Sequence, residues 1–172
     1  MKRIVLLSDT HGYVDDAMLK YLKDCDEIWH AGDIGVPEVS EQLEQITTYR
    51  AVWGNIDGHV LRTMHPEYMR FACEGVDVFM THIGGYPGKY TKRMREYLQK
   101  TVPQLYICGH SHILKVMRDK KLGLMHFNPG AAGLHGFHKM RTMLRFTCHE
   151  GKIDNLEVIE LGLKGKGGKN LI

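Results

Sequence analysis

Long apolar runs and paired cysteines are both lacking in this sequence of 172 residues. The first apolar run, residues 4–7, is followed at once by Ser8 and Asp9, so it is too short for a signal peptide or a membrane span. None of the four cysteines belongs to a CxxC pair, which argues against a zinc knuckle or a thioredoxin-type motif. Three of them lie in or beside apolar segments, where a reduced, buried thiol is the ordinary state. We therefore expect a cytoplasmic protein with no membrane partner.

A dense block of charge of one sign is lacking as well. The formal net charge is +3 and the basic residues are dispersed, so nucleic acid is not expected as a partner. The exception is the Lys- and Gly-rich segment 164–169, and we expect residues 164–172 to form a flexible C-terminal tail. No repeat, low-complexity block or linker divides residues 1–163. A chain of this length can bury a proper core, so residues 1–163 are predicted to be a single domain.

Apolar periodicity predicts alternating strands and helices in the first third of the chain. The runs at 4–7, 27–31 and 49–53 are typical of buried parallel strands. Residues 14–25 carry apolar side chains at helical spacing, and Pro37 suits the first turn of a second helix. This β-α-β-α-β order predicts a largely parallel sheet with right-handed crossovers.

The rest of the chain is predicted to be rich in hairpins. Short polar or Gly-containing turns separate three pairs of apolar segments, at 68–73 and 76–81, 113–117 and 122–127, and 143–148 and 153–161. A helix is expected at about 89–100 and a further strand at 105–108. The whole pattern predicts an α/β protein with a mixed sheet, arranged as two sheets packed face to face with helices outside.

Polar side chains follow five successive predicted strands, where ligands bind in open α/β sheets. These residues are Asp9, His11, Asp33, Asn55, His82, His110 and His112. Seven such groups exceed what one four-coordinate ion needs and suit two ions that share a bridging carboxylate. Mixed imidazole and carboxylate ligands fit Mn, Fe, Ni or Zn better than Mg or Ca. Two ions about 3.5–4 Å apart can clamp a phosphoryl group and activate a bridging water.

The motif series resembles the calcineurin-like metallophosphoesterase family, over residues 3 to about 130. It consists of Asp9-x-His11, Gly32-Asp33, Gly54-Asn55, Thr81-His82 and Gly109-His110-Ser111-His112. The short length, the sequence GNID at residues 54–57 and the sequence NPGA at residues 128–131 are similar to the small bacterial and archaeal phosphodiesterase branch of that family.

The resemblance implies a four-layer α-β-β-α sandwich with two mixed sheets. It implies that Asp9, His11 and His112 bind one divalent ion, that Asn55, His82 and His110 bind the other, and that Asp33 bridges both. Mn is the expected metal, with Ni, Zn or Fe as alternatives. The expected activity is phosphodiester hydrolysis, in which a metal-bridging hydroxide attacks phosphorus in line. Asp33, Asn55 and His82 are then the catalytic residues and a small phosphoester is the substrate. The sequence leaves open whether the protein forms a homo-oligomer.

The segment Gly54-Asn55-Ile56-Asp57 departs from the pattern of larger relatives, which carry His directly after the Asn. That His protonates the leaving alkoxide or contacts the phosphate, and Ile56 can do neither. Asn55 and His59 are the candidates for contacting the substrate instead. Without a general acid, the rate should depend strongly on the pKa of the leaving group, which favours activated aryl diesters over alkyl monoesters.

Structural alternatives stand beside these functional hypotheses. Asp33 alone could cap the helix that begins near Pro37, Gly54-Asn55 could be an ordinary turn, and His82 could be a satisfied buried histidine. Among the other functional classes, a non-catalytic scaffold resembling the retromer subunit of this fold is the main rival. A nuclease, a phosphomonoesterase and a nucleotide hydrolase are further alternatives.

The remaining polar residues near the motifs are expected to be structural. His30 is expected to pack or hydrogen-bond behind the site, and His126 is expected to pack on a strand. His135 and His138 are expected to lie in a surface loop. Arg141 and Arg145 alternate with apolar residues and are expected on a solvated strand face.

Overall fold

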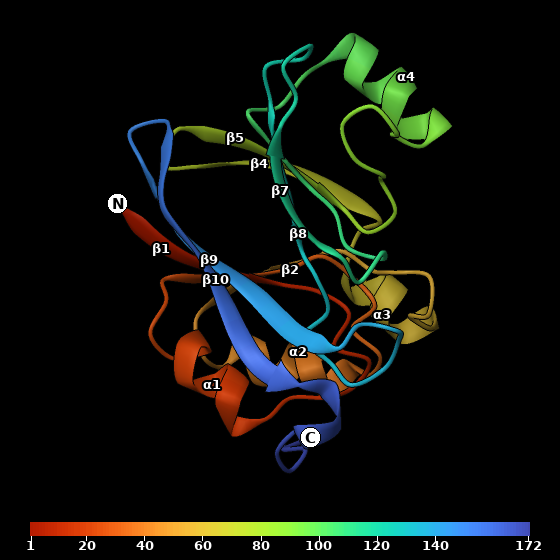
Figure 1. Ribbon diagram of the computed structural model, residues 1–172, viewed down its shortest axis with the longest axis vertical. Coiled ribbons are helices and arrows are strands. Elements are labelled where there is room, and N and C mark those ends of the chain that lie inside the picture. The colour runs from red at the N-terminus through yellow and green to blue at the C-terminus, as the bar shows by residue number, and fades with distance from the viewer.

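The computed structural model describes all 172 residues and contains two five-stranded sheets (Figure 1). The strand order of the first sheet is β10-β9-β1-β2-β3. Its strands are β1 (Lys2–Leu7), β2 (Glu27–His30), β3 (Thr48–Ala51), β9 (Met140–His149) and β10 (Lys152–Leu163). The strands β1, β2 and β3 pair in parallel, whereas β9 and β10 pair antiparallel, so the sheet is mixed.

The second sheet has the order β4-β5-β6-β8-β7. Its strands are β4 (Tyr68–Cys73), β5 (Val76–Thr81), β6 (Leu105–Ile107), β7 (Leu114–Arg118) and β8 (Met125–Pro129). The three inner strands are parallel and the two edge strands antiparallel. The strand expected from residue 122 begins only at Met125, because Leu122 and Leu124 pack in the core beneath a helix instead.

Four helices cover the outer faces of the sheets. They are α1 (Asp16–Leu22), α2 (Pro37–Glu44), α3 (His59–Met64) and α4 (Lys92–Lys100). The first three share a core with the first sheet, and α4 packs on the second sheet, which gives the four layers α-β-β-α (Figure 1). None of these helices has the length and apolar character that crossing a bilayer requires. All four cysteines are free, and three of them are buried as expected.

The position of strand β1 between two cores explains why residues 4–7 are all apolar, without alternation. Ile4 and Leu6 belong to the core between the two sheets, whereas Val5 and Leu7 belong to the core beneath the helices. Successive side chains of a strand point to opposite faces, so burial of both faces requires a continuous apolar run. With both faces covered, the carboxyl end of the strand is the part that can present polar side chains at an opening.

Arg141 contradicts the expectation of a solvated strand face. Its side chain is only 1% exposed and donates from Nη1 and Nη2 to Asp15, at 2.9 and 3.1 Å. Asp15 also caps helix α1 by accepting from the Met18 amide. Arg145, in contrast, keeps a third of its side chain exposed and pairs with the exposed Glu157. Sequence alternation alone did not separate the two arginines, because the inward one is paired by a residue far away in the chain.

The predicted C-terminal tail lies against the loop that precedes α1. It begins with a 3-10 turn (Lys164–Lys166), after which the Gly168 amide donates to Asp15 and the Leu171 amide donates to the Val14 carbonyl. The tail therefore contacts the same buried carboxylate as Arg141, while its mobility stays a prediction.

Replacement of Arg141 by Met should lower the free energy of unfolding by about 3–5 kcal/mol, because it leaves the Asp15 carboxylate buried without its cation. Urea denaturation measures this loss. Arg145→Met is the matched control on the same strand, and should cost no more than about 1 kcal/mol because its ion pair is exposed. Equal losses in the two variants would contradict the structural role of the Asp15–Arg141 pair.

Candidate metal centre

Six of the seven predicted ligands form two clusters at the carboxyl ends of the central strands. Asp9, His11 and His112 make up the first cluster, and Asp33, His82 and His110 the second. In each cluster the candidate ligand atoms lie within 4.8 Å of one another. Asp9 and His11 follow β1 and Asp33 follows β2, whereas the other three follow β5 and β6. The centre is therefore built where the edges of the two sheets meet, and neither sheet contains it alone.

Unpartnered polar atoms mark the first cluster. Asp9 is fully buried, and its Oδ1 has no hydrogen-bond partner although His112 Nε2 lies 3.0 Å away. His11 Nε2, 4.0 Å from the same oxygen, is also buried without a partner. A buried polar atom without a hydrogen-bond partner costs about 1–3 kcal/mol of stability, so such atoms call for an explanation. A divalent cation between the three side chains would satisfy them, and the donor set fits one.

His82 shows the same fit in the second cluster. Its Nδ1 lies 2.7 Å from the Ala31 carbonyl, which can only accept, so Nδ1 carries the proton. The lone pair of Nε2 then faces two further acceptors, Asp33 Oδ1 at 3.2 Å and Asn55 Oδ1 at 3.1 Å. Three converging acceptors need a cation among them, either a metal ion or a proton. Orientation of a metal-binding imidazole by a carbonyl at its other nitrogen is the usual arrangement.

The protonation of His82 and Asp33 is coupled. Burial favours the neutral imidazole, but the carboxylates of Asp33 and Asp9 outweigh it and raise the pKa of His82. Burial likewise opposes ionisation of Asp33, but contact with His82 lowers the pKa of Asp33 on balance. The carboxylate is therefore held ionised, as a metal ligand must be.

Asp33 lies between the two clusters. Its Oδ1 faces His82 of the second cluster, and its Oδ2 lies 3.7 Å from His11 Nε2 of the first. The alternative role as a helix cap is wrong, because the N-cap residue of α2 is Val36 and no side chain caps that helix. Two carboxylate oxygens directed at two ligand clusters is the geometry expected of a bridging group.

The backbone of the ligand residues is strained. Asp9, His11, Asp33, His110 and His112 all have positive φ, between 50° and 66°. Residues with a Cβ seldom adopt this left-handed region, which costs them about 1–2 kcal/mol each. Five of the candidate ligands share it, so the fold holds these side chains at a local cost that a functional site explains.

The segment 54–57 is tied to the loop that carries Asp33. The Asp57 carboxylate accepts from the backbone amides of Ile34, Gly35 and Gly54, at 3.1, 2.8 and 2.7 Å. The Ile56 amide donates to Asp33 Oδ1 at 3.0 Å, whereas the residue as a whole is 46% exposed. Asp57 is therefore structural, and the backbone of residue 56 orients the Asp33 carboxylate whatever the side chain at that position.

Arg62 also supports this segment, and sequence analysis missed it. Its Nε donates to the Asp57 carbonyl at 2.7 Å and its Nη2 to the Asn55 carbonyl at 3.3 Å. Its guanidinium lies over the Trp53 ring, 4.3 Å from the centroid. Helix α3, which carries Arg62, was not predicted, so no sequence signal pointed to this residue. His59 begins the same helix with an exposed side chain, and its contact with substrate stays a prediction.

His30 lies behind the centre, as expected. Its Nδ1 accepts from the Gly32 amide, so Nε2 carries the proton and donates to Thr10 Oγ1 at 2.9 Å. The Thr10 hydroxyl in turn donates to the Ile34 carbonyl. Burial lowers the pKa of His30 to about 3, so it stays neutral and fixes the positions of the loops that carry Asp9 and Asp33.

The histidines of the late loop separate into two kinds. His135 is exposed, as expected, with its ring 5.6 Å from that of His11. The same expectation was wrong for His138, which is buried and has Nε2 3.0 Å from the Gly133 carbonyl. Its ring packs edge-on against His112, 5.2 Å between centroids, so it supports a candidate ligand. His126 is buried against Tyr106, in agreement with the expected packing role.

Comparison with known protein families identifies the superfamily. The model of the calcineurin-like phosphoesterase superfamily domain matches residues 1–151. A curated relative from Methanothermobacter thermautotrophicus, named a probable metallophosphoesterase, is 29% identical over 136 residues, which is 74% of this chain and 76% of that protein.

Solved structures share the fold. A single-substitution variant of Vps29 from Entamoeba histolytica superposes with a TM-score of 0.71 at 14% identity, covering 92% of this chain and 98% of that one. A structure described as a novel archaeal phosphodiesterase superposes with a TM-score of 0.64 at 17% identity, covering 91% and 99%. At these identities the likeness concerns the fold alone.

Gly54→Ala should weaken metal binding, because the new Cβ would lie 2.1 Å from Asp33 Oδ1 and 2.2 Å from the Asp33 backbone nitrogen. We expect the affinity for Mn²⁺ to fall by about 10–100-fold, the usual cost of disturbing the groups that orient a ligand. Isothermal titration calorimetry measures it. Gly58→Ala, four residues on, meets no atom within 4 Å and should bind as the wild type does. Unchanged affinity in Gly54→Ala would contradict the placement of Asp33.

Proposed function

Because the chain belongs to the calcineurin-like phosphoesterase superfamily, a family of metal-dependent phosphoric ester hydrolases, we propose that it is a dinuclear phosphodiesterase. One observation carries the proposal: the Asp33 carboxylate faces His82 with one oxygen and His11 with the other. Each of these histidines belongs to a separate cluster of candidate ligands. A bridging carboxylate between two such clusters is what a two-metal hydrolase requires.

The proposed metal ligands are the seven predicted from the sequence, with Asp9, His11 and His112 on one ion and Asn55, His82 and His110 on the other. When bound, two divalent ions would supply a water of lowered pKa as nucleophile and neutralise the charge on the phosphoryl oxygens. Mn²⁺ is the proposed metal, since it accepts imidazole together with carboxylate and amide oxygens.

Backbone groups around the candidate ligands fix the geometry in this proposal. Ala31 holds His82 in the tautomer whose Nε2 is free, and the Ile56 amide orients the Asp33 carboxylate. Asn55 adds an oxygen ligand without the negative charge that would repel a phosphate. A cavity of about 130 Å³ lies beside Asn55 and His82 and gives the phosphoryl group access to the second cluster.

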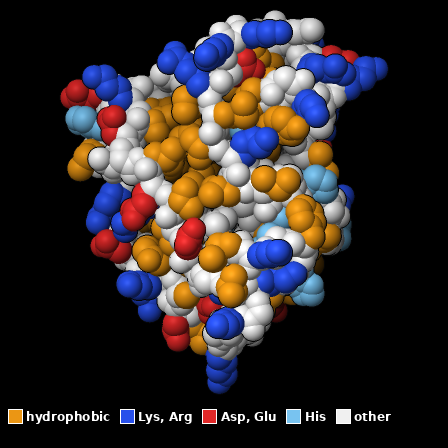
Figure 2. Space-filling model, viewed as in Figure 1, with side chains coloured by type: hydrophobic (Ala, Val, Ile, Leu, Met, Phe, Trp, Pro, Cys, Tyr) orange, Lys and Arg blue, Asp and Glu red, His pale blue; other side chains and the backbone are white.

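A small phosphoester is the proposed substrate. Lys and Arg side chains are scattered over the face shown in Figure 2, with acidic side chains among them, and form no stripe for a nucleic-acid backbone. A phosphomonoesterase or nucleotide hydrolase is the alternative within enzymes. A scaffold without activity is the alternative outside them, and the likeness of fold to Vps29 is the reason to test it.

Asp33→Asn should abolish most of the activity, because the neutral amide cannot bridge two cations. With bis(p-nitrophenyl) phosphate and Mn²⁺, we expect kcat to fall by at least about 100-fold. Asp24→Asn, a substitution of the same chemistry at an exposed residue paired with Arg3, should keep full activity. If the wild type binds no metal and shows no turnover with Mn, Ni, Zn or Mg, the scaffold is favoured. Turnover unaffected by Asp33→Asn would remove the bridging role.

Ile56 should make the rate depend on the leaving group. Its exposed aliphatic side chain cannot protonate an alkoxide, so we expect a steep decrease of kcat as the pKa of the leaving phenol or alcohol rises. Ile56→His should flatten this dependence and improve alkyl esters most. A slope unchanged by Ile56→His, or a selective loss of alkyl substrates in His59→Ala, would show that another residue already acts as the acid.

A further inference from the structure

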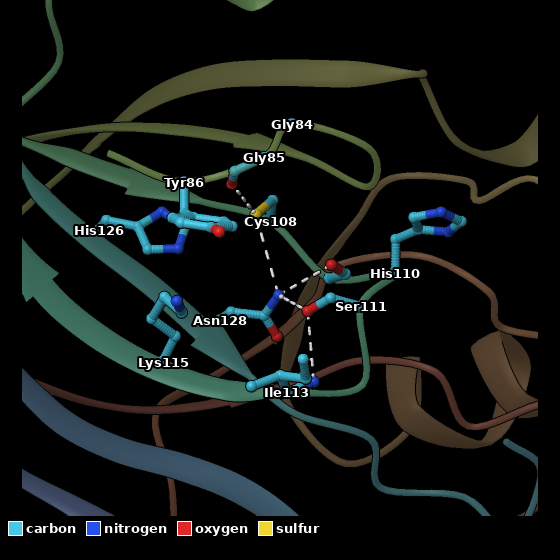
Figure 3. A pocket seen from close by; sticks show the side chains of 11 residues that line it. Gly84, Gly85, Tyr86, Cys108, His110, Ser111, Ile113, Lys115, His126 and Asn128 are labelled. Carbon is cyan, nitrogen blue, oxygen red and sulfur yellow. Dashed lines mark hydrogen bonds between the residues drawn. The ribbon is translucent and has the colours of Figure 1, made fainter. Parts of the chain in front are cut away.

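A second cavity, of about 200 Å³, lies beside His110 of the metal centre (Figure 3). Its walls come from the loop after β5, the end of β6 and the neighbouring strands β7 and β8. His110 lies at one end, and the side chains of Tyr86, His126 and Lys115 lie at the other (Figure 3). The cavity therefore extends away from the metal ligands and is not part of the ligand set.

Lys115 gives the far end of the cavity its charge. Among the lining residues it is the one formal cation outside the histidines, and none of them is acidic. Its Nζ lies 3.8 Å from the centroid of the Tyr86 ring and forms no ion pair. The aromatic face holds the ammonium in place without neutralising it, so its charge is available to a ligand.

Two further polar side chains of the cavity, Asn128 and Ser111, leave one hydrogen-bond donor free. Both amide hydrogens of Asn128 are used, since it donates to the Gly109 carbonyl and Ser111 Oγ, and its Oδ1 accepts from the Gly130 amide. Ser111 Oγ accepts from Asn128 and the Ile113 amide, which leaves its hydroxyl proton free to donate.

His126 is 1% exposed, and its Nδ1 has no hydrogen-bond partner. Burial lowers the pKa of His126 to about 4, so it adds no positive charge near neutral pH. The charge complement of the cavity is therefore a single anion facing Lys115, with a polar atom of the ligand within the cavity for the Ser111 hydroxyl to meet.

We propose that this cavity binds one ester group of the substrate, a planar or aromatic group that ends in a carboxylate or a second phosphate. The inference rests on the proposed phosphodiesterase function, because the phosphoryl group would sit at the metal ligands while the ester group extends past His110 toward Lys115. The volume equals about seven waters, enough for a substituted benzene ring. Tyr86 and Ile113 would cover the faces of the ring, and Lys115 would pair with the terminal anion.

The test uses diesters that share a p-nitrophenyl group and differ in the second ester. The matched pair carries 4-carboxyphenyl or 4-carbamoylphenyl, which have the same shape and differ in charge. We expect kcat/KM of the wild type to favour the carboxylate by about tenfold, as one charge-assisted contact would give. A third diester with 4-phosphonophenyl distinguishes a phosphate-like end group from a carboxylate.

The variants are judged by the ratio of the two kcat/KM values, which cancels any general loss of activity. Lys115→Gln should bring the carboxyl-to-carbamoyl ratio to about one, whereas Lys115→Arg should keep the preference. Lys100→Gln, at an exposed lysine on α4, removes the same charge elsewhere and should leave the ratio at the wild-type value. A preference that survives in Lys115→Gln, or no preference in the wild type, would overturn the proposal.

A binding measurement separates this proposal from the proposed activity. In ¹H–¹⁵N NMR spectra, 4-hydroxybenzoate should shift the amides of Ser111 and Lys115, whereas the neutral 4-hydroxybenzamide should shift them far less. Lys115→Gln should abolish the difference. Lys115-dependent benzoate binding without diester turnover would support the binding role of the cavity and contradict the phosphodiesterase activity. Diester turnover with equal effects of the two fragments would support the enzyme activity and contradict the preference of the cavity for an anion.

Discussion

The candidate metal centre depends on one constraint: the acceptor atoms of Asp33, His82 and Asn55 face one another. His82 must carry its proton on Nδ1 because that nitrogen meets the Ala31 carbonyl. Without a second proton, its other nitrogen faces the oxygens of Asp33 and Asn55 with no hydrogen atom to share. The first cluster repeats the arrangement with an unpartnered oxygen of Asp9 and an unpartnered nitrogen of His11. Such a set of acceptors is stable in a folded chain when cations lie among them.

The fold supplies the rigidity that this convergence requires. Both faces of β1 and β2 are buried, which fixes the strand ends, and five candidate ligands in the loops that follow the strands share the left-handed backbone. Asp57 joins the Asp33 loop to the Asn55 loop through three backbone amides, and Arg62 holds the same loop from outside. The packed sheets on either side thus stabilise the ligand loops against the conformational free energy of their strained backbone.

Patterns local in the sequence predicted the parts that local chemistry determines. The continuous apolar run of β1, the alternation of strands and helices, and the polar residues at strand ends were all visible there. The short helix α3 was missed because six residues carry little periodicity, and Arg62 was missed with it. Arg141 and His138 were placed at the surface because their partners, Asp15 and the Gly133 carbonyl with the nearby His112 ring, come close only in the folded chain. The cavity at Lys115 likewise needs three strands and a loop to form, so spacing could not reveal it.

The proposed role of Asp33 is to bridge two metal ions held by the two clusters. Anomalous diffraction from crystals of the full chain grown with Mn²⁺ tests it most directly. We expect two manganese peaks on either side of the Asp33 carboxylate, about 3.5–4 Å apart, one beside Asp9, His11 and His112 and the other beside Asn55, His82 and His110. A single peak, or peaks away from these residues at saturating Mn²⁺, would contradict the bridging role of Asp33.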